Sequence, residues 1–422
     1  MIGGKHLACN LRTVQPMKLL VVSQYYWPEN FRINEVAQAL AAKGIAVEVL
    51  TGKPNYPGGK MFEGYRISGI QHEHHNGVSI HRLPLLPRRS GAAWLAINYL
   101  SFMLVGLLLA PFILRKRSFD VIFVYGTSPI IQAIPAIFLG WLTRRPVILW
   151  VQDLWPDSLR ATGHVTNKRA LKSVGRVVRF IYDHVDLLLV QSAGFIAPVR
   201  SLTSNKNIHY YPNSVGDEFK SSYTSTPHPI TKTFSGFTVL FAGNIGVAQA
   251  VEVIIGAATL LRDEAQIKFV ILGDGSKRAW MLNEVVARNL TNVSLPGKFP
   301  TEAMPGFMQA ASALLVTLTD HEIFAQTVPN KVQAYMAVGR PIIACLRGEG
   351  ARLVVEAGAG LAVPAEDAAA LAAAVLTLRD LPASALEEMG ENGRRYFGEN
   401  FDQEVLTLQL ISHLTVLSEN GG

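Results

Sequence analysis

The 422-residue sequence has few cysteines and few charged side chains. Its two cysteines, Cys9 and Cys345, are too few for a disulfide framework or a cysteine-rich zinc site, and they indicate a reducing compartment. Charged residues make up only 17% of the chain, yet they leave a net charge of +7. With 49% hydrophobic residues, the chain is apolar enough to fold rather than stay disordered. This balance points to a membrane surface or to nucleic acid as a partner.

The sequence also lacks a secretory signal and any Asp-x-Asp pair. Residues 1–16 contain no sustained apolar core, so they are predicted to form a disordered extension. Because such a carboxylate pair is missing, the sequence offers no obvious site for a divalent metal. The cluster of His72, His74 and His75 is predicted to lie in a solvated loop rather than to bind a metal.

Short apolar strands alternate with helical segments in two blocks. The first block covers residues 17–212 and the second covers residues 237–400, with a Ser-, Thr- and Pro-rich linker at 213–236 and a helix at 401–422. This order predicts an α/β protein with two Rossmann-like doubly wound domains facing a central cleft. In the first block, strands are expected at 18–23, 46–50, 77–83, 120–125, 146–151 and 187–191.

An uncharged run extends from Ser90 to Leu114, and basic residues flank both ends. A helix of this length would measure roughly 37 Å, enough to span a bilayer. A single crossing is excluded if the strands before and after the run pair in one sheet. The run is therefore either a buried core helix or a segment lying in one leaflet, with the apolar stretch 130–142 beside it. The flanking positive charge favours the membrane interface.

Glycines and one lysine in the second block indicate a site for a diphosphate. Gly243, Asn244 and Gly246 follow the first strand of that block and open a helix, where backbone N–H groups can face an anion. An ordinary turn is the other interpretation. Lys331 begins a later helix, where an ammonium is electrostatically unfavourable unless an anion lies beside it. Asp274 and Gly275 follow a central strand, either as a helix cap or as the edge of the site.

A carboxylate in the first block is the candidate catalytic base. Asp153 follows the strand at 146–151, and such strand ends meet at the ligand-binding edge of a parallel sheet. A carboxylate there can accept a proton from an acceptor hydroxyl. A helix N-cap is the alternative role.

Several segments together resemble glycosyltransferases of the GT-B fold, and within them glycosyltransferase family 4. They include SQYYWPENFRINEVAQAL, TGKPNYPGG, VYGTSP, WVQDLWPDSL, LFAGNIGVAQAVE, ILGDGSKR and VPNKVQAYMAVGRPIIA. The likeness extends from Met17 over nearly the whole chain and is greatest to the branch that adds amino sugars, notably N-acetyl-L-fucosamine, to lipid-linked O-antigen or capsule precursors. The resemblance implies a bacterial enzyme on the cytoplasmic face of the plasma membrane. It also implies a UDP-sugar donor, an undecaprenyl-diphosphate-linked acceptor, retention of configuration, and no metal or cofactor.

The resemblance also assigns residues, with one departure from the family pattern. Trp27, Glu29 and Gln152 would contact the acceptor, Phe299 the base, and Asn330 the donor. The family has two Glu residues before its Gly-x-Pro element, and here these positions are Gln326 and Ala334. Glu322 just upstream would serve as a second catalytic residue. Glu349 is the predicted replacement for the ribose-binding carboxylate, and Glu356 is the alternative.

Two other functions remain open on the sequence alone. A non-hydrolysing UDP-sugar 2-epimerase also has two Rossmann domains, but it would not need the apolar run at 90–114. A basic nucleic-acid-binding protein would explain the charge, although no motif of such proteins is recognised here.

Overall fold

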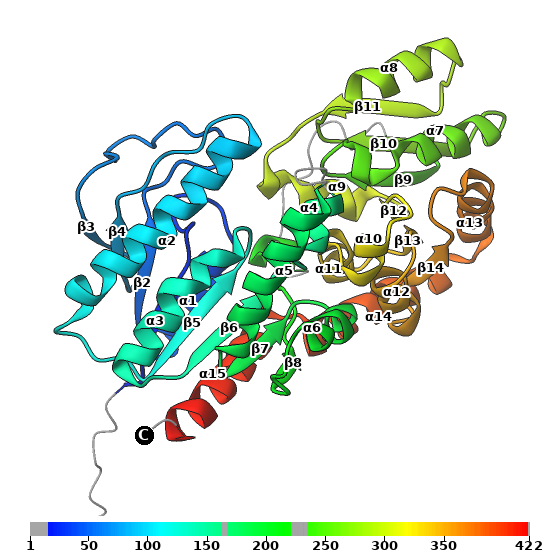
Figure 1. The fold of residues 1–422 in the computed structure, drawn as a ribbon. Coiled ribbons are helices and arrows are strands. Elements are labelled where there is room, and N and C mark those ends of the chain that lie inside the picture. The colour runs from blue at the N-terminus through cyan, green and yellow to red at the C-terminus, as the bar shows by residue number, and fades with distance from the viewer. Residues whose placement is uncertain (1–15, 162–166, 221–230, 232–233, 421–422) are drawn as a thin grey trace, which may run out of the picture. The chain divides into compact units, whose positions relative to one another are not determined.

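The computed structural model describes residues 16–161, 167–220, 231 and 234–420. The extension predicted at 1–16 falls outside this range except for its last residue. Two compact units divide the chain, and each is described by itself. The first unit comprises Met1–Val124, Gln132–Val147 and Leu414–Gly422, and the second comprises Tyr125–Ile131 and Ile148–His413. Figure 1 shows the strands and helices of both.

The first sheet has eight strands in the order β3-β4-β2-β1-β5-β6-β7-β8. Their bounds are β1 (Lys18–Val22), β2 (Ala46–Gly52), β3 (Gln71–His75), β4 (Val78–Leu83), β5 (Val121–Gly126), β6 (Val147–Val151), β7 (Leu187–Val190) and β8 (Ile208–Tyr210). β3 pairs antiparallel with β4 through a turn at Asn76 and Gly77, both of which have positive φ. The prediction that the histidine cluster lies in a loop is therefore wrong, since these histidines form an edge strand.

Helices connect the strands of this sheet. They are α1 (Ile33–Ala42), α2 (Ala92–Leu114), α3 (Ala133–Thr143), α4 (Asp157–Ala161), α5 (Lys168–Asp183) and α6 (Ile196–Leu202). In the first unit α2 and α3 lie side by side (Figure 1). A Cβ on Gly106 of α2 would lie 2.9 Å from Cγ of Pro135 in α3, so the close packing of these helices depends on glycine.

By its length and composition, helix α2 could cross a membrane. However, Leu19 of β1 pairs with Val121 of β5, and these strands precede and follow α2 in the chain. All the residues that pair, Leu19 to Val22 and Val121 to Val124, are in the first unit. A single crossing by α2 would separate the paired strands, so the structure excludes it, as expected.

The second sheet has the order β11-β10-β9-β12-β13-β14. Its strands are β9 (Phe237–Ala242), β10 (Ile267–Leu272), β11 (Val293–Gly297), β12 (Ala313–Thr317), β13 (Ile342–Cys345) and β14 (Gly360–Val363). The helices in this part of the chain are α7 (Val251–Leu260), α8 (Arg278–Ala287), α9 (Met304–Ala310), α10 (Glu322–Gln326), α11 (Asn330–Val338), α12 (Glu349–Glu356), α13 (Ala368–Asp380), α14 (Ala383–Asn400) and α15 (Gln403–Asn420). Alternate residues of β9 enter two separate cores, with Leu240 in one and Val239 in the other. Helix α7 begins at Val251, directly after Ala250, which adopts a left-handed conformation.

Candidate active site

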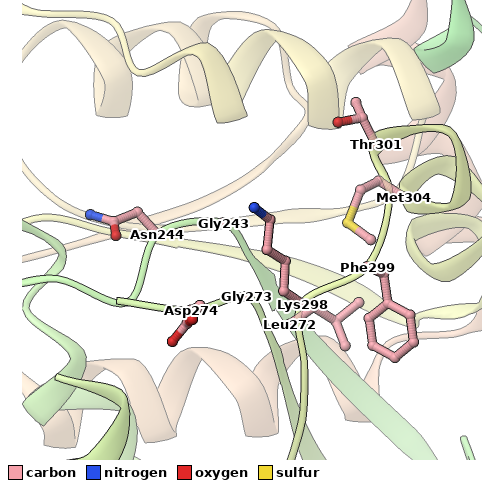
Figure 2. Close-up of a pocket in the computed structure, with 9 residues that line it drawn as sticks. All are labelled: Gly243, Asn244, Leu272, Gly273, Asp274, Lys298, Phe299, Thr301 and Met304. Atoms are coloured by element: carbon pink, nitrogen blue, oxygen red, sulfur yellow. The ribbon is translucent and has the colours of Figure 1, made fainter. Parts of the chain in front are cut away.

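A pocket of about 380 Å³ lies at the carboxyl ends of β9, β10 and β11, in the second unit. Figure 2 shows the residues that line it: Gly243, Asn244, Leu272, Gly273, Asp274, Lys298, Phe299, Thr301 and Met304. Asn244 and Asp274 lie on one side of the pocket and Phe299, Met304 and Thr301 on the other, with Lys298 between them (Figure 2). This arrangement suits a ligand with an anionic part and a flat ring.

Two glycines allow the strand-end loops to approach each other. A Cβ on Gly273, which has a φ of +140°, would collide with the carbonyl oxygen of Gly243. A Cβ on Gly243, which has a φ of +136°, would lie 2.6 Å from Cε and 3.0 Å from Nζ of Lys331. The pocket wall at Gly243 is therefore bare backbone, and the Lys331 amine lies directly behind it.

We expect Gly243→Ala to weaken nucleotide binding strongly, because the methyl group would displace Lys331 and strain the backbone at this φ. A loss of about 100-fold in affinity corresponds to about 2.7 kcal/mol, within the range for strained backbone positions. Isothermal titration with UDP measures the effect, and Gly398→Ala, where no atom lies within 4 Å of the added methyl, is the control. Equal UDP affinity in both variants would contradict the prediction.

Lys331 is the second residue of α11, and Pro329 is the N-cap of this helix. The Nζ atom is buried and has no hydrogen-bond partner among the described residues. It lies 3.7 Å from the centroid of the Phe241 ring. Burial lowers the pKa of the Lys331 amine to about 7. Such an amine, at the amino end of a helix, is suited to bind an anion that enters and supplies the missing charge.

Most of the predicted donor residues lie at this pocket. Asn244, Asp274 and Phe299 line it directly. Gly246 and Gly275 belong to the same two loops, which are joined by a hydrogen bond of 2.8 Å from Ile245 N–H to the Asp274 carbonyl oxygen. The alternative role of Asp274 and Gly275 as a helix cap is wrong, because α8 begins at Arg278 with Lys277 as its N-cap.

Gly246, Gly275 and Lys331 do not themselves line the pocket, and four more predicted residues lie outside its two loops. The Glu349 carboxylate pairs with Arg352 at 2.9 Å, and Glu322 lies 3.7 Å from Arg347. The backbone oxygen of Gln326 accepts a hydrogen bond from the Ser192 hydroxyl. Asn330 is the first residue of α11. Their predicted roles toward the donor stay predictions.

Lys298 and the core residue Gln333 were not predicted to be functional. Lys298 lines the pocket and contributes a cation beside Gly243 (Figure 2). Gln333 donates to the carbonyl oxygen of Asn213 at 2.8 Å, and the Asn213 amide donates to Gln152 Oε1 at 3.0 Å. These two hydrogen bonds connect Gln152 through Asn213 to helix α11, which carries Gln333 and Lys331, and they hold the Gln152 side chain in place. The residues that they join are more than 60 positions apart in sequence, so no local pattern indicated these bonds.

The Asp153 carboxylate is held by Ser128 in the second unit. The Ser128 N–H donates to Asp153 Oδ2 at 3.0 Å, and its hydroxyl donates to the same oxygen at 2.9 Å. Trp155 Nε1–H in turn donates to the Ser128 hydroxyl. Burial raises the pKa of the Asp153 carboxyl, and the bonds from Ser128 oppose the rise. Asp153 does not cap α4, which begins at Asp157, so the alternative N-cap role is wrong.

We expect Asp153→Asn to lower kcat by about 10²- to 10⁴-fold, as for loss of a general base, without unfolding the protein. The amide oxygen can still accept from Ser128, but the side chain can no longer take up a proton. Steady-state kinetics at saturating donor measures the loss. Ser128→Ala removes a hydrogen bond to the carboxylate, so it should raise the acidic pKa of the rate profile. An unchanged kcat in Asp153→Asn would remove the base assignment.

The predicted acceptor residues Glu29 and Trp27 lie in the first unit. Glu29 is buried, and its carboxylate accepts from the backbone N–H groups of Asn55 and Tyr56 at 2.8 and 2.7 Å. Burial raises the pKa of Glu29 to about 7, against these bonds. Glu29 thus anchors the loop after β2. The Trp27 ring stacks on His75 with centroids 3.9 Å apart.

Two family models match the chain in succession. The model described as a glycosyl transferase 4-like domain matches residues 30–214, and the model described as glycosyl transferases group 1 matches residues 236–380. The second match contains the pocket and Lys331.

Among curated proteins, the chain is 25% identical over 279 residues to a Pseudomonas aeruginosa protein named as the glycosyltransferase WbjE, covering 64% of this chain and 69% of that protein. It is 24% identical over 348 residues to WcaI of Escherichia coli strain K12, named as a colanic acid biosynthesis glycosyl transferase, covering 76% and 82%.

Solved structures share the fold over nearly the whole chain. Sucrose-phosphate synthase from Thermosynechococcus elongatus has a TM-score of 0.72 at 18% identity, covering 96% of this chain and all of its own. The Anabaena protein HepE, solved in complex with UDP, has a TM-score of 0.69 at 14% identity, covering 95% and 100%. The predicted fold class, GT-B with two α/β domains, is confirmed.

Proposed function

The chain is a glycosyltransferase of family 4 with the GT-B fold, and from this premise we propose that it transfers a sugar from a UDP-sugar to an undecaprenyl-diphosphate-linked saccharide. The proposed donor sugar is an amino sugar, N-acetyl-L-fucosamine. This premise sets aside the epimerase and nucleic-acid-binding alternatives.

The buried, unpartnered Lys331 amine behind Gly243 is the observation that carries the donor assignment. A diphosphate beside Gly243 would bring the negative charge that this amine lacks, and it would raise the pKa of Lys331 from about 7. Lys298 adds a second cation, and Phe299 offers an aromatic face for the base. HepE, of the same fold, is solved with UDP and with UDP-glucose.

In the proposed reaction the acceptor hydroxyl attacks the anomeric carbon of the donor, and the bond from that carbon to the diphosphate oxygen breaks. Asp153 accepts the hydroxyl proton, and UDP leaves with the electron pair. Lys331, Lys298 and the amino end of α11 stabilise the charge on the leaving diphosphate. These groups support a reaction without a metal, and we propose that configuration is retained.

We further propose that the first unit rests on the cytoplasmic face of the plasma membrane through an apolar stripe on α2. Residues of this helix four positions apart point outward, and they include Leu100, Leu104, Leu108 and Phe112, all exposed. The buried residues of α2 follow the same four-residue spacing on another side of the helix, and they are Asn98, Phe102, Gly106, Ala110 and Leu114. Basic residues precede and follow α2, which complements an anionic leaflet. Such a position would bring the enzyme to its lipid-linked acceptor.

A donor screen followed by a transfer assay tests the function. Binding stabilises a protein by RT ln(1 + [L]/Kd), so a UDP-sugar that raises Tm more than UDP alone identifies the sugar. The donor found is then incubated with an undecaprenyl-diphosphate-linked saccharide, and the product is detected by mass spectrometry. Stabilisation by UDP-N-acetyl-L-fucosamine with transfer to the lipid-linked saccharide is the expected result. Stabilisation by GDP-sugars only, or transfer only to soluble sugars, would contradict the proposal.

A further inference from the structure

A second cavity, of about 250 Å³, lies in the first unit where the carboxyl ends of α2 and α3 meet the sheet. Its walls include the buried side chains of Leu114, Phe119, Ile122 and Leu139. Phe119 precedes β5, and Ile122 is the second residue of that strand. The cavity therefore lies toward the amino ends of the strands, away from the edge where parallel sheets bind their substrates. The proposed glycosyl transfer therefore assigns no role to this cavity.

The mouth of this cavity is positively charged. Arg115 and Arg117 line it, and Lys116 lies between them in sequence. Arg117 forms an ion pair with Glu48, in which 2.6 Å separate Arg117 Nη1 from Glu48 Oε2. Arg115 is exposed and makes no hydrogen bond or ion pair within the described part of the chain. Arg115 is thus available to an anionic group at the mouth of an apolar cavity.

The mouth is also continuous with the exposed apolar surface. Pro111 and Leu142 line the cavity, and their sequence neighbours Phe112 and Trp141 are each more than 70% exposed. At roughly 30 Å³ for a water-sized group, 250 Å³ has room for about eight such groups. That volume matches part of one hydrocarbon chain, and it is too small for a folded protein segment.

We propose that this cavity binds one acyl chain of an anionic glycerophospholipid, with the lipid phosphate at Arg115. The lipid enters from the leaflet on which α2 is proposed to rest, so the inference builds on the proposed membrane contact. Arg115 supplies a charge-assisted hydrogen bond to the phosphate, and the cavity removes methylene groups from water. A specifically bound lipid would set the orientation of α2 and α3 at the membrane–water interface, whereas an apolar stripe alone does not select one orientation.

Native mass spectrometry of the full chain in detergent tests the site. Phosphatidylglycerol is titrated, and the expected result is one saturable adduct that phosphatidylcholine of the same chain length does not reproduce. Leu142→Trp should fill the mouth, and Arg115→Glu should repel the phosphate, each lowering occupancy about tenfold. Leu260→Trp and Arg66→Glu, which change exposed residues outside both the cavity lining and the α2 stripe, are the matched controls.

Several results would overturn the assignment. They are adducts that increase without a plateau, wild-type occupancy in both cavity variants, and preferential binding of undecaprenyl phosphate, which would assign the cavity to the acceptor lipid. Sedimentation with vesicles, measured in parallel, separates this site from the membrane contact. If the protein forms the lipid adduct but does not sediment with vesicles, the proposed membrane contact is rejected and the cavity assignment stands. If the protein sediments with vesicles but forms no adduct, the cavity assignment is rejected and the membrane contact stands.

Discussion

Lys331→Met is expected to remove nearly all turnover while making the ligand-free protein more stable. In the proposed reaction this amine stabilises charge on the leaving diphosphate, and loss of one such group costs about 10²- to 10³-fold in kcat. Without a ligand, the same amine is buried, unpartnered and beside the Phe241 ring. Methionine fills a similar volume without a polar atom, so the cost of burying the amine disappears.

The gain in stability depends on pH in a defined direction. The pKa of Lys331 is about 7 in the folded protein and near 10.5 when unfolded, so the unfolded state binds more protons between these values. Stability of the wild type therefore rises with pH from about 7 toward 10. The advantage of Lys331→Met, on the order of 3 kcal/mol, should be largest at pH 6 to 7 and should fade in alkaline solution.

Thermal unfolding from pH 6 to pH 9.5, with and without UDP, measures both effects. The variant should unfold at a higher temperature than wild type without ligand, and UDP should no longer raise its Tm. Lys206→Met, at an exposed position in the same unit, should match wild type in every condition. A UDP-induced shift of wild-type size in Lys331→Met would remove the diphosphate assignment.

The sequence predicted the position of Lys331 but not its state. A lysine at a helix amino end is visible in the sequence, and so is the glycine loop at Gly243. Burial of the amine against Phe241 arises from tertiary packing, and that packing lowers its pKa to about 7. The hydrogen bonds from Gln333 through Asn213 to Gln152 arise in the same way, from residues distant in sequence.

The errors in the sequence prediction also have physical causes. β3 consists of QHEHH, which has no apolar residue, so no apolar alternation indicated a strand. Its position at the sheet edge requires no apolar face, and the turn at Asn76 and Gly77 specifies the hairpin instead. The ribose-binding role of Glu349 stays a prediction, but the ion pair of its carboxylate with Arg352 could not be predicted from its position in the sequence.

Replacing Leu104, Leu108 and Phe112 with serine is expected to release the protein from membranes without unfolding it. These side chains are 52%, 67% and 73% exposed, so they contribute little to the packing of α2. The helix is held instead through its other side, where Asn98 accepts from Gln24 Nε2 at 2.9 Å. The substitutions therefore act on the outward stripe alone.

Each of these side chains would bury apolar area in the leaflet, at about 1 kcal/mol per side chain for the exposed part. Three losses of this size lower partitioning into vesicles about 100-fold. Sedimentation with phosphatidylglycerol vesicles measures the partition, and circular dichroism and Tm confirm folding. Transfer to a short-chain, water-soluble acceptor should continue, because none of the three residues lines the donor pocket.

A matched control uses equally exposed apolar residues elsewhere. Leu260, Val286 and Val355 are at least 59% exposed and belong to the second unit, which lacks the flanking basic clusters of α2. Serine at these three positions removes a similar apolar area and should leave sedimentation unchanged. If both triple variants sediment like wild type, the stripe does not carry membrane contact. If both are released equally, the effect reflects surface hydrophobicity in general, and the specific role of α2 is rejected.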